Sequence, residues 1–578
     1  MLPRWSLETI YPSLDSSEFQ NEFKTIDNLV EKLNKELSDN TTNFNDILTT
    51  YQNLIDVSST ISSYSYAVLS TNTKDVKALN ALNRVEKAML AVSDLQVKFL
   101  NYLKNDKERA LKEVDEKYHY ILNLMCEQQQ HLMSEAEEAL ASDLSRSGAS
   151  AWSRLQDTIS SNATYQWSED QIKTVIQLRS LAFDQDRKVR EKAFKAELEV
   201  WKQHEIALGA ALNGVKGASI TLNQRRKHKN AVELSTKLQR IDSEILDSLI
   251  SSIEKYLPVF RKYLKAKAHL LEVEKLAFYD LFAPIGKSER KYEYSEAQQF
   301  IVEHFSSFYK PMGEFAQMAF DKNWIDSEPR EGKVGGAYCT SFPLRKESRI
   351  LANYDYSFDG IVTIAHELGH AYHDHMTNDL PALLGQYPMT LAETASIFSQ
   401  FVIFKGALED AKDSEKLVLI ESFLQDSTQT CVDILSRYYF EKELFEKREE
   451  GELTPSQLNE LMIKAQKNSY GDALDESLLH PYMWAVKGHY YIEELPFYNY
   501  PYAFGLLFGL GVYNLKEEHQ GDFGLLYNKL LELTGQNSVN EVTKSVGFDV
   551  SKKEFWEKSL DLIASYVDEF ASLVGYNK

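Results

Sequence analysis

The chain of 578 residues has little cysteine, glycine or proline. It holds three cysteines, Cys126, Cys339 and Cys431, and no two of them form a Cys-x-x-Cys spacing. An odd and sparse set of this kind excludes a disulfide framework. Only 24 glycines and 13 prolines are present. Because both residue types interrupt helices, their scarcity favours long helices.

Positive charge and long apolar runs are also lacking. The 64 Lys and Arg residues stand against 86 Asp and Glu, which leaves a formal net charge of −22. Nucleic-acid binding needs a basic face, so this balance argues against such a partner. No apolar run approaches the roughly 20 residues of a membrane span, and residues 1–6 lack the pattern of a signal peptide. We therefore expect a soluble cytoplasmic protein without a membrane partner.

The spacing of apolar residues predicts a mainly α protein. Over about 18–140, apolar residues recur at steps of three and four positions, which is typical of amphipathic helices. A serine-rich break covers 142–161, and a further helix is predicted over 168–208. We place a domain boundary near residue 200, which divides the chain into an N-terminal helical domain, 1–200, and a second domain, 201–578.

The second domain contains the pattern His-Glu-x-x-His. His366 and His370 are four residues apart in a segment that reads as helix, so both lie on one helical face, about 6 Å apart along the axis. Two imidazoles at this separation can share one zinc ion. Glu367, beside the first histidine, can reach a water on that ion and take its proton. The pattern predicts a hydrolytic centre with one Zn²⁺ per chain.

A catalytic zinc usually takes three protein ligands, so a third is needed. His373 shares the helical face but lies about 10 Å from His366 along the axis, too far for one ion. We expect it to support the site or to contact substrate. Glu393, in the opening turn of a second apolar helix, is the preferred ligand. The alternative is that Thr390-x-x-Glu393 forms a capping box, in which Glu393 only bonds back to its own helix start.

A Gly-rich, β-prone segment precedes the motif. Residues 332–342 and 348–355 read as two short strands joined as a hairpin, and Ser357 or Asp359 would cap the motif helix. An extended peptide can add itself to an edge strand through backbone hydrogen bonds. A purely structural hairpin is the alternative. The substrate-binding residues predicted here are Gly335, Gly336, Ala337 and Tyr338.

These blocks resemble a known family. The stretch from His366 to His373, followed by Leu-Ala-Glu393-Thr-Ala-Ser, is similar to the oligoendopeptidase F group of the thimet oligopeptidase family of zinc peptidases. The segments 335–339, 497–505 and the opening 5–11 also fit, so the resemblance covers nearly the whole chain. It implies that His366, His370 and Glu393 bind zinc and that Glu367 is the general base. It also implies a helical body in two halves around a deep channel, with a small β-sheet near the zinc helix, which cuts short unstructured peptides internally.

The Tyr-rich segment after the motif has its own chemistry. Hydrolysis of a peptide bond creates an oxyanion that needs a donor, which a phenol or a histidine can supply. Family members carry a histidine followed by tyrosines here, matching His489, Tyr498 and either Tyr500 or Tyr502. We predict catalytic roles for His489, Tyr498 and Tyr502, and substrate contact for Tyr500. The alternative is that these aromatic residues only line the core.

Two rival functions remain open. A zinc carboxypeptidase of related helical fold would need a fixed cation for the terminal carboxylate, and Lys333, Arg345 and Lys487 are the candidates. A helical peptide-binding scaffold would use His366 and His370 only as polar residues. The sequence predicts no oligomeric state.

Overall fold

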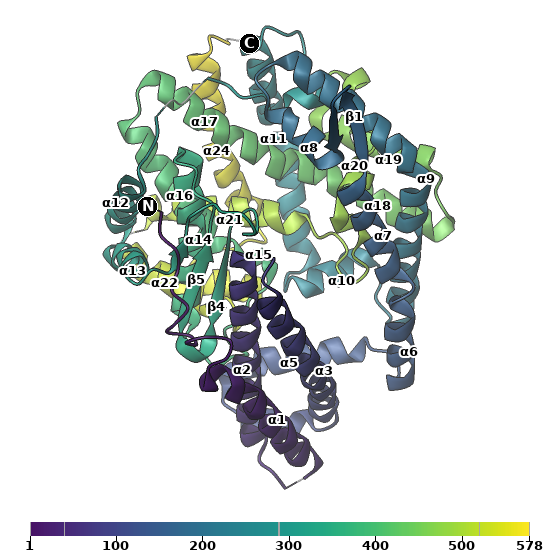
Figure 1. Ribbon diagram of the computed structural model, residues 1–578, viewed down its shortest axis with the longest axis vertical. Coiled ribbons are helices and arrows are strands. Elements are labelled where there is room, and N and C mark those ends of the chain that lie inside the picture. Colours follow the sequence, from purple (N-terminus) through teal and green to yellow (C-terminus); the bar gives the residue numbers. More distant parts are fainter. Residues whose placement is uncertain (1, 40, 287–289, 520, 577–578) are drawn as a thin grey trace. The chain divides into compact units, whose positions relative to one another are not determined.

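The computed structural model describes residues 2–39, 41–286, 290–519 and 521–576 (Figure 1). About 72% of the chain is helical and 4% is in strands, which confirms the mainly α prediction. Within the described ranges, no helix is both long enough and apolar enough to cross a membrane.

The chain forms two compact units, and each draws on three stretches of sequence. Unit 1 comprises Met1–Gln130, Glu289–Glu409 and Leu515–Phe548, and unit 2 comprises His131–Ser288, Asp410–Asn514 and Asp549–Lys578. The boundary expected near residue 200 falls inside α9 (Arg187–Arg225), within unit 2.

The first helices of unit 1 pack side by side. In α1 (Ser17–Ser38) the buried residues Phe19, Phe23, Ile26 and Leu33 recur at helical spacing, and they face α2 and α3. The other helices of this unit are α2 (Phe44–Thr71), α3 (Val76–Asn105), α4 (Lys107–Glu113), α5 (His119–Gln130), α12 (Tyr294–Phe308), α13 (Lys310–Asp321), α14 (Phe358–Thr377), α15 (Met389–Ala392), α16 (Thr394–Asp410), α22 (Phe523–Leu533) and α23 (Val539–Ser545).

A three-stranded sheet lies beside α14 in unit 1. Its strands β3 (Ile325–Asp326), β4 (Tyr338–Phe342) and β5 (Glu347–Leu351) stand in the order β3-β5-β4. β4 and β5 are antiparallel, with Tyr338 opposite Leu351. This confirms the predicted hairpin and places β4 at the edge of the sheet (Figure 1).

Unit 2 is built around two long helices, α9 and α11 (Ser243–Leu270). Its buried charges are paired, as burial requires: Lys216 Nζ lies 2.7 Å from Glu441 Oε1, and Lys267 Nζ lies 2.6 Å from Glu421 Oε1. The remaining elements are α6 (Glu135–Ser145), α7 (Ala149–Asn162), β1 (Thr164–Ser168), β2 (Gln171–Thr174), α8 (Val175–Ser180), α10 (Ala231–Leu238), α17 (Asp413–Thr428), α18 (Ile434–Glu450), α19 (Pro455–Tyr470), α20 (Met483–Val486), α21 (Tyr500–Glu518) and α24 (Lys553–Leu573).

Candidate metal centre

Helix α14 carries the His-Glu-x-x-His motif, and its start matches one of the two predicted caps. Ser357 is the N-cap, and its hydroxyl accepts a hydrogen bond from the Gly360 N–H at 3.0 Å. Ile361, Ile364 and Leu368 are fully buried, so the apolar face of the helix packs into unit 1. The half-buried imidazoles of the motif lie on another face of the same helix.

Glu393 stands at a break between two helices rather than in a capping box. It ends α15, and α16 starts at the next residue. The N-cap of α15 is Pro388, which makes no side-chain cap. The capping alternative is therefore wrong. The Ser396 hydroxyl donates a 2.6 Å hydrogen bond to Glu393 Oε2 and holds the carboxylate in place.

A glycine in the motif lets these two segments approach closely. A Cβ atom on Gly369 would lie 2.4 Å from the Ala395 carbonyl oxygen and 2.6 Å from Ser396 Cα. Any larger residue would push the start of α16 away from α14. The close approach brings Glu393, two residues before Ala395, to the motif histidines.

Three side chains converge on one point. Glu393 Oε2 lies 3.4 Å from His366 Nε2 and 3.5 Å from His370 Nε2. Ligands about 2.1 Å from a tetrahedral zinc are themselves about 3.4 Å apart, so these separations fit one ion. Within the described ranges, this is the one cluster of three His, Cys, Asp or Glu residues with ligand atoms all within 4.8 Å of one another.

The two histidines are held in a form suited to a metal. His366 Nδ1 lies 3.3 Å from Gln400 Oε1, which directs the Nε2 lone pair toward Glu393. The Ala392 carbonyl accepts a hydrogen bond from the His370 ring. Burial lowers the pKa of His370 to about 4, and only the neutral imidazole can bind a cation.

Glu367 has the environment of a proton carrier. Burial, with the neighbouring Glu393 carboxylate, raises the pKa of Glu367 to about 8, and a hydrogen bond from the Cys339 backbone N–H opposes this rise. A divalent cation would also oppose it, because positive charge favours the carboxylate. The contact with Cys339 places the base directly beside edge strand β4.

The residues predicted to bind substrate lie at the start of β4. A Cβ on Gly335 or Gly336 would meet no atom within 4 Å, so this backbone is open. Gly336 has φ +75°, and its carbonyl accepts a 2.9 Å hydrogen bond from Asn353. Ala337 follows, and Tyr338 opens the strand with its hydroxyl 2.7 Å from Ser70 Oγ.

His373 lies elsewhere than expected for a substrate contact. Its side chain is fully buried, with Nε2 2.8 Å from Thr534 Oγ1 and the ring stacked on Tyr387 at 4.0 Å. Its position three residues beyond His370 turns it into the packing of unit 1. His373 therefore supports the motif helix, and we leave it out of the proposed substrate-binding set.

His489, Tyr498 and Tyr502 are brought together within unit 2. The His489 ring centroid lies 4.4 Å from that of Tyr498 and 6.5 Å from that of Tyr502, and all three side chains are half-buried. Helix α21 starts at Tyr500, so Tyr498 precedes the helix and the two phenols do not share a helical face as expected. Tyr500 is 1% exposed, so it too is left out of the substrate-binding set.

Two buried residues that the sequence analysis missed hold His489. Asn499 Oδ1 lies 2.8 Å from His489 Nδ1 and accepts a 2.9 Å hydrogen bond from Arg437 Nη1. No local motif marks this pair, since 62 residues separate Arg437 from Asn499. Gln400 was also missed, although its place seven residues after Glu393, two helical turns on, was a usable signal.

Two of the three cations considered for a carboxypeptidase are already engaged. Lys333 is fully buried, with Nζ 2.7 Å from Asp326 Oδ1. Arg345 donates through Nε to the Ile10 carbonyl at 3.2 Å. Lys487 lies in unit 2.

Comparison with known families identifies the class of protein. Residues 180–562 match the sequence model of peptidase family M3, and residues 102–165 match the model described as Oligopeptidase F. The chain therefore belongs to peptidase family M3 and is a metallopeptidase, which confirms the resemblance stated above.

Individual relatives agree with this assignment. The chain is 23% identical to Oligopeptidase PepF of Bacillus subtilis (strain 168), over 99% of this chain and 87% of that protein. A structure from Chlamydophila abortus, described as a peptidase, matches with a TM-score of 0.84 at 20% identity, covering 99% of this chain and 98% of that one. The oligoendopeptidase-F structure from Enterococcus faecium matches with a TM-score of 0.68 at 19% identity, covering 96% and 99%. At these identities the structures establish the fold alone.

Proposed function

We propose that this metallopeptidase is a zinc-dependent oligoendopeptidase, which hydrolyses internal bonds of short unstructured peptides. The observation that carries the proposal is the convergence of His366 Nε2 and His370 Nε2 on Glu393 Oε2, with Glu367 on the same helix. Relatives named oligopeptidase and oligoendopeptidase support the substrate class.

His366, His370 and Glu393 would hold the ion. When bound, zinc acts as a Lewis acid on a carbonyl and brings the pKa of water to about 7. Glu367 takes the proton from the attacking water and later gives it to the leaving amine.

The peptide would lie along edge strand β4. Gly335 and Gly336 are open before the strand, Ala337 and Tyr338 lead from them into it, and Cys339 ties the strand to Glu367. Main-chain hydrogen bonds recognise any sequence in extended form, which suits a peptidase of broad specificity.

Tyr498 and Tyr502 would donate hydrogen bonds to the developing oxyanion, and His489 would join them through Nε2 as the imidazolium, because its Nδ1–H is already donated to Asn499 Oδ1. Their grouping in unit 2 supports a shared role, and the contact of His489 Nδ1 with Asn499 leaves Nε2 for a ligand. A donor of this kind typically contributes about 10²–10³ in rate.

The direct test combines metal analysis with mapping of cleavage products. Purified protein should hold one zinc per chain and cut a peptide blocked at both termini at an internal bond. Glu367→Gln should keep the zinc and lose turnover by about 10³-fold or more, while the exposed Glu314→Gln should leave both unchanged. Near wild-type cleavage by the Glu367 variant would refute the mechanism.

Three further results would decide against parts of the proposal. A blocked peptide left intact while an unblocked one is trimmed would favour the carboxypeptidase, and absence of stoichiometric zinc would favour the scaffold. Efficient cleavage of casein beside a ten-residue peptide would refute the restriction to short peptides.

A further inference from the structure

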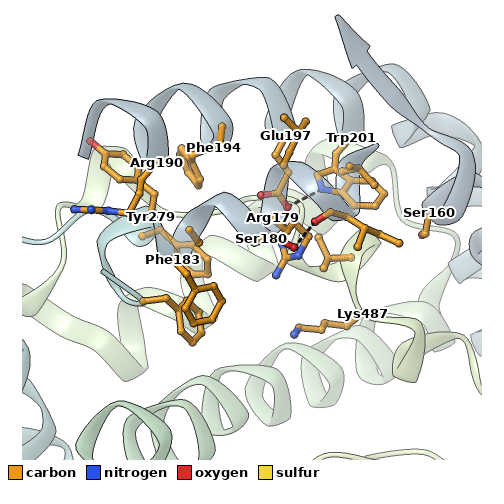
Figure 2. A pocket seen from close by; sticks show the side chains of 18 residues that line it. Ser160, Arg179, Ser180, Phe183, Arg190, Phe194, Glu197, Trp201, Tyr279 and Lys487 are labelled. Atoms are coloured by element: carbon orange, nitrogen blue, oxygen red, sulfur yellow. Dashed lines mark hydrogen bonds and ion pairs between the residues drawn. The ribbon is translucent and has the colours of Figure 1, made fainter. Parts of the chain in front are cut away.

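A separate cavity of about 490 Å³ lies wholly within unit 2 (Figure 2). It is lined mainly by α8, α9 and the segment 278–282, with Lys487 from the segment after α20. Small-molecule sites in proteins typically measure about 300–1,000 Å³. None of its lining residues belongs to the metal centre or to the cluster of His489, Tyr498 and Tyr502.

Most of the wall is apolar and aromatic. Phe194 and Trp201 are buried on the α9 side. Ile176 and Phe183, which also line the cavity, are 56% and 59% exposed. Exposed apolar residues that together line a concave surface mark a ligand site more often than a single exposed apolar residue does.

The acidic group of the cavity is already satisfied. Glu197 Oε1 accepts hydrogen bonds from Arg179 Nη1 at 2.5 Å and Trp201 Nε1 at 3.0 Å, and it lies 3.1 Å from His480 Nε2. Arg190, another lining cation, is paired with the fully buried Asp280 at 3.0 Å. Both carboxylates are thus engaged by other cations of the cavity wall.

Lys487 is that further cation. Within the described part of the chain, its Nζ has no hydrogen-bond or ion-pair partner, and Figure 2 shows its ammonium end apart from the cluster at Glu197. Burial, with the nearby Arg437 cation, lowers the pKa of Lys487 to about 8, and the carboxylates of Asp433 and Glu197 oppose this shift without contacting the ammonium group. A half-buried ammonium group in a chain of net charge −22 is most simply stabilised by an anionic ligand.

We infer that this cavity binds a small apolar carboxylate, such as the C-terminal residue of a short peptide with an aromatic side chain. The carboxylate would bind Lys487, and N–H groups of Arg179 that Glu197 does not use would assist. The aromatic group would pack against Phe194 and Phe183.

The test is isothermal titration calorimetry on the full-length, zinc-loaded protein. N-acetyl-L-phenylalanine should bind at least about tenfold more tightly than its neutral amide, because the amide cannot pair with an ammonium group. Lys487→Met, which keeps the apolar stem, should weaken binding of the acid about tenfold or more. Lys202→Met, an exposed lysine on α9 outside the cavity, should leave it unchanged.

Two results would overturn the inference. One is equal affinity for the acid and the amide. The other is unchanged affinity in Lys487→Met, which would point to binding at the metal instead. If Lys487→Met misfolds, Phe183→Asp replaces it, because residue 183 is exposed and a carboxylate there should repel the ligand.

Comparison with 3-phenylpropionate shows which kind of carboxylate the cavity prefers. Tighter binding of the acetylated amino acid indicates a peptide terminus, and equal binding indicates any apolar acid. Calorimetry detects the ligand whether or not the protein cleaves peptides, so failure here and failure of the proposed peptidase activity are distinguishable.

Discussion

Gln400 Oε1 lies 3.3 Å from Nδ1 of His366, on the side of the imidazole opposite the metal position. The two residues come from different helices, α16 and α14, and Glu393, which ends α15 directly before α16, lies two helical turns ahead of Gln400. One segment thus provides both a proposed ligand and the group that orients another ligand. Displacement of α16 would disturb the contact of Gln400 with His366 and, through the adjoining Glu393, both contacts of that carboxylate with the histidines.

Replacement of Gln400 by Leu should weaken zinc binding by about 10–100-fold, because the acceptor that fixes the His366 tautomer is lost. Gln400→Glu keeps an acceptor and should retain most of the affinity. Competition with a fluorescent chelator measures the zinc affinity of both variants. The exposed Gln317→Leu on α13 is the matched control. Wild-type affinity in Gln400→Leu would show that His366 needs no such support.

Gly369→Ala should weaken zinc binding by at least about tenfold and lower the free energy of unfolding by about 1–3 kcal/mol, because its Cβ would overlap the Ala395 carbonyl. Gly335→Ala, where a Cβ meets no atom within 4 Å, should change neither quantity. Chelator competition and urea unfolding provide the two measurements. If Gly369→Ala binds zinc normally, the approach of α14 to α16 does not set the position of Glu393.

The elements of the site that depend on local sequence were predictable. The helix carrying His366 and His370, its Ser357 cap and the β4–β5 hairpin follow from periodicity and turn chemistry over short windows. The choice of Glu393 needed the family resemblance, because spacing alone equally allowed a capping box. The start of α15 at Met389 removes the capping box, and the close approach at Gly369, a tertiary contact that no local pattern encodes, brings Glu393 to the histidines.

The division of the chain into units was beyond reach for a similar reason. Each unit combines three distant stretches, so no single change in composition marks a boundary. Asn499 and Arg437 were missed because a buried polar pair far apart in sequence leaves no periodic signal. Full burial of His373 and Tyr500 likewise depends on what the rest of the chain packs against them.

Acid should destabilise the protein through Glu197. Its hydrogen bonds and the charges of Arg179 and His480 outweigh the cost of burial and lower its pKa from 4.5 to about 2. Because the native pKa lies below the unfolded value, the stabilisation of about 3 kcal/mol is complete above about pH 5 and is lost as pH falls toward 2.

Glu197→Gln should therefore lower the free energy of unfolding at pH 7, and the difference from wild type should shrink between pH 5 and pH 3. Urea unfolding at several pH values gives this comparison, with the exposed Glu199→Gln on the same helix as control. A difference that stays constant with pH would mean that packing at Glu197, rather than its charge, stabilises the fold.

Asn499→Asp should raise the pKa of His489. At present burial lowers that pKa, and the neutral amide oxygen of Asn499 is shared between His489 and Arg437. A carboxylate in the same place would favour the imidazolium, so the pKa should rise by about 1 unit or more. In the pH profile of kcat/KM, the limb that His489 governs should move to higher pH by the same amount. The exposed Asn468→Asp on α19 is the control and should not move this limb. A structural role for Asn499 predicts loss of activity at every pH without a shift of the profile, and that outcome would remove His489 from the proposed chemistry.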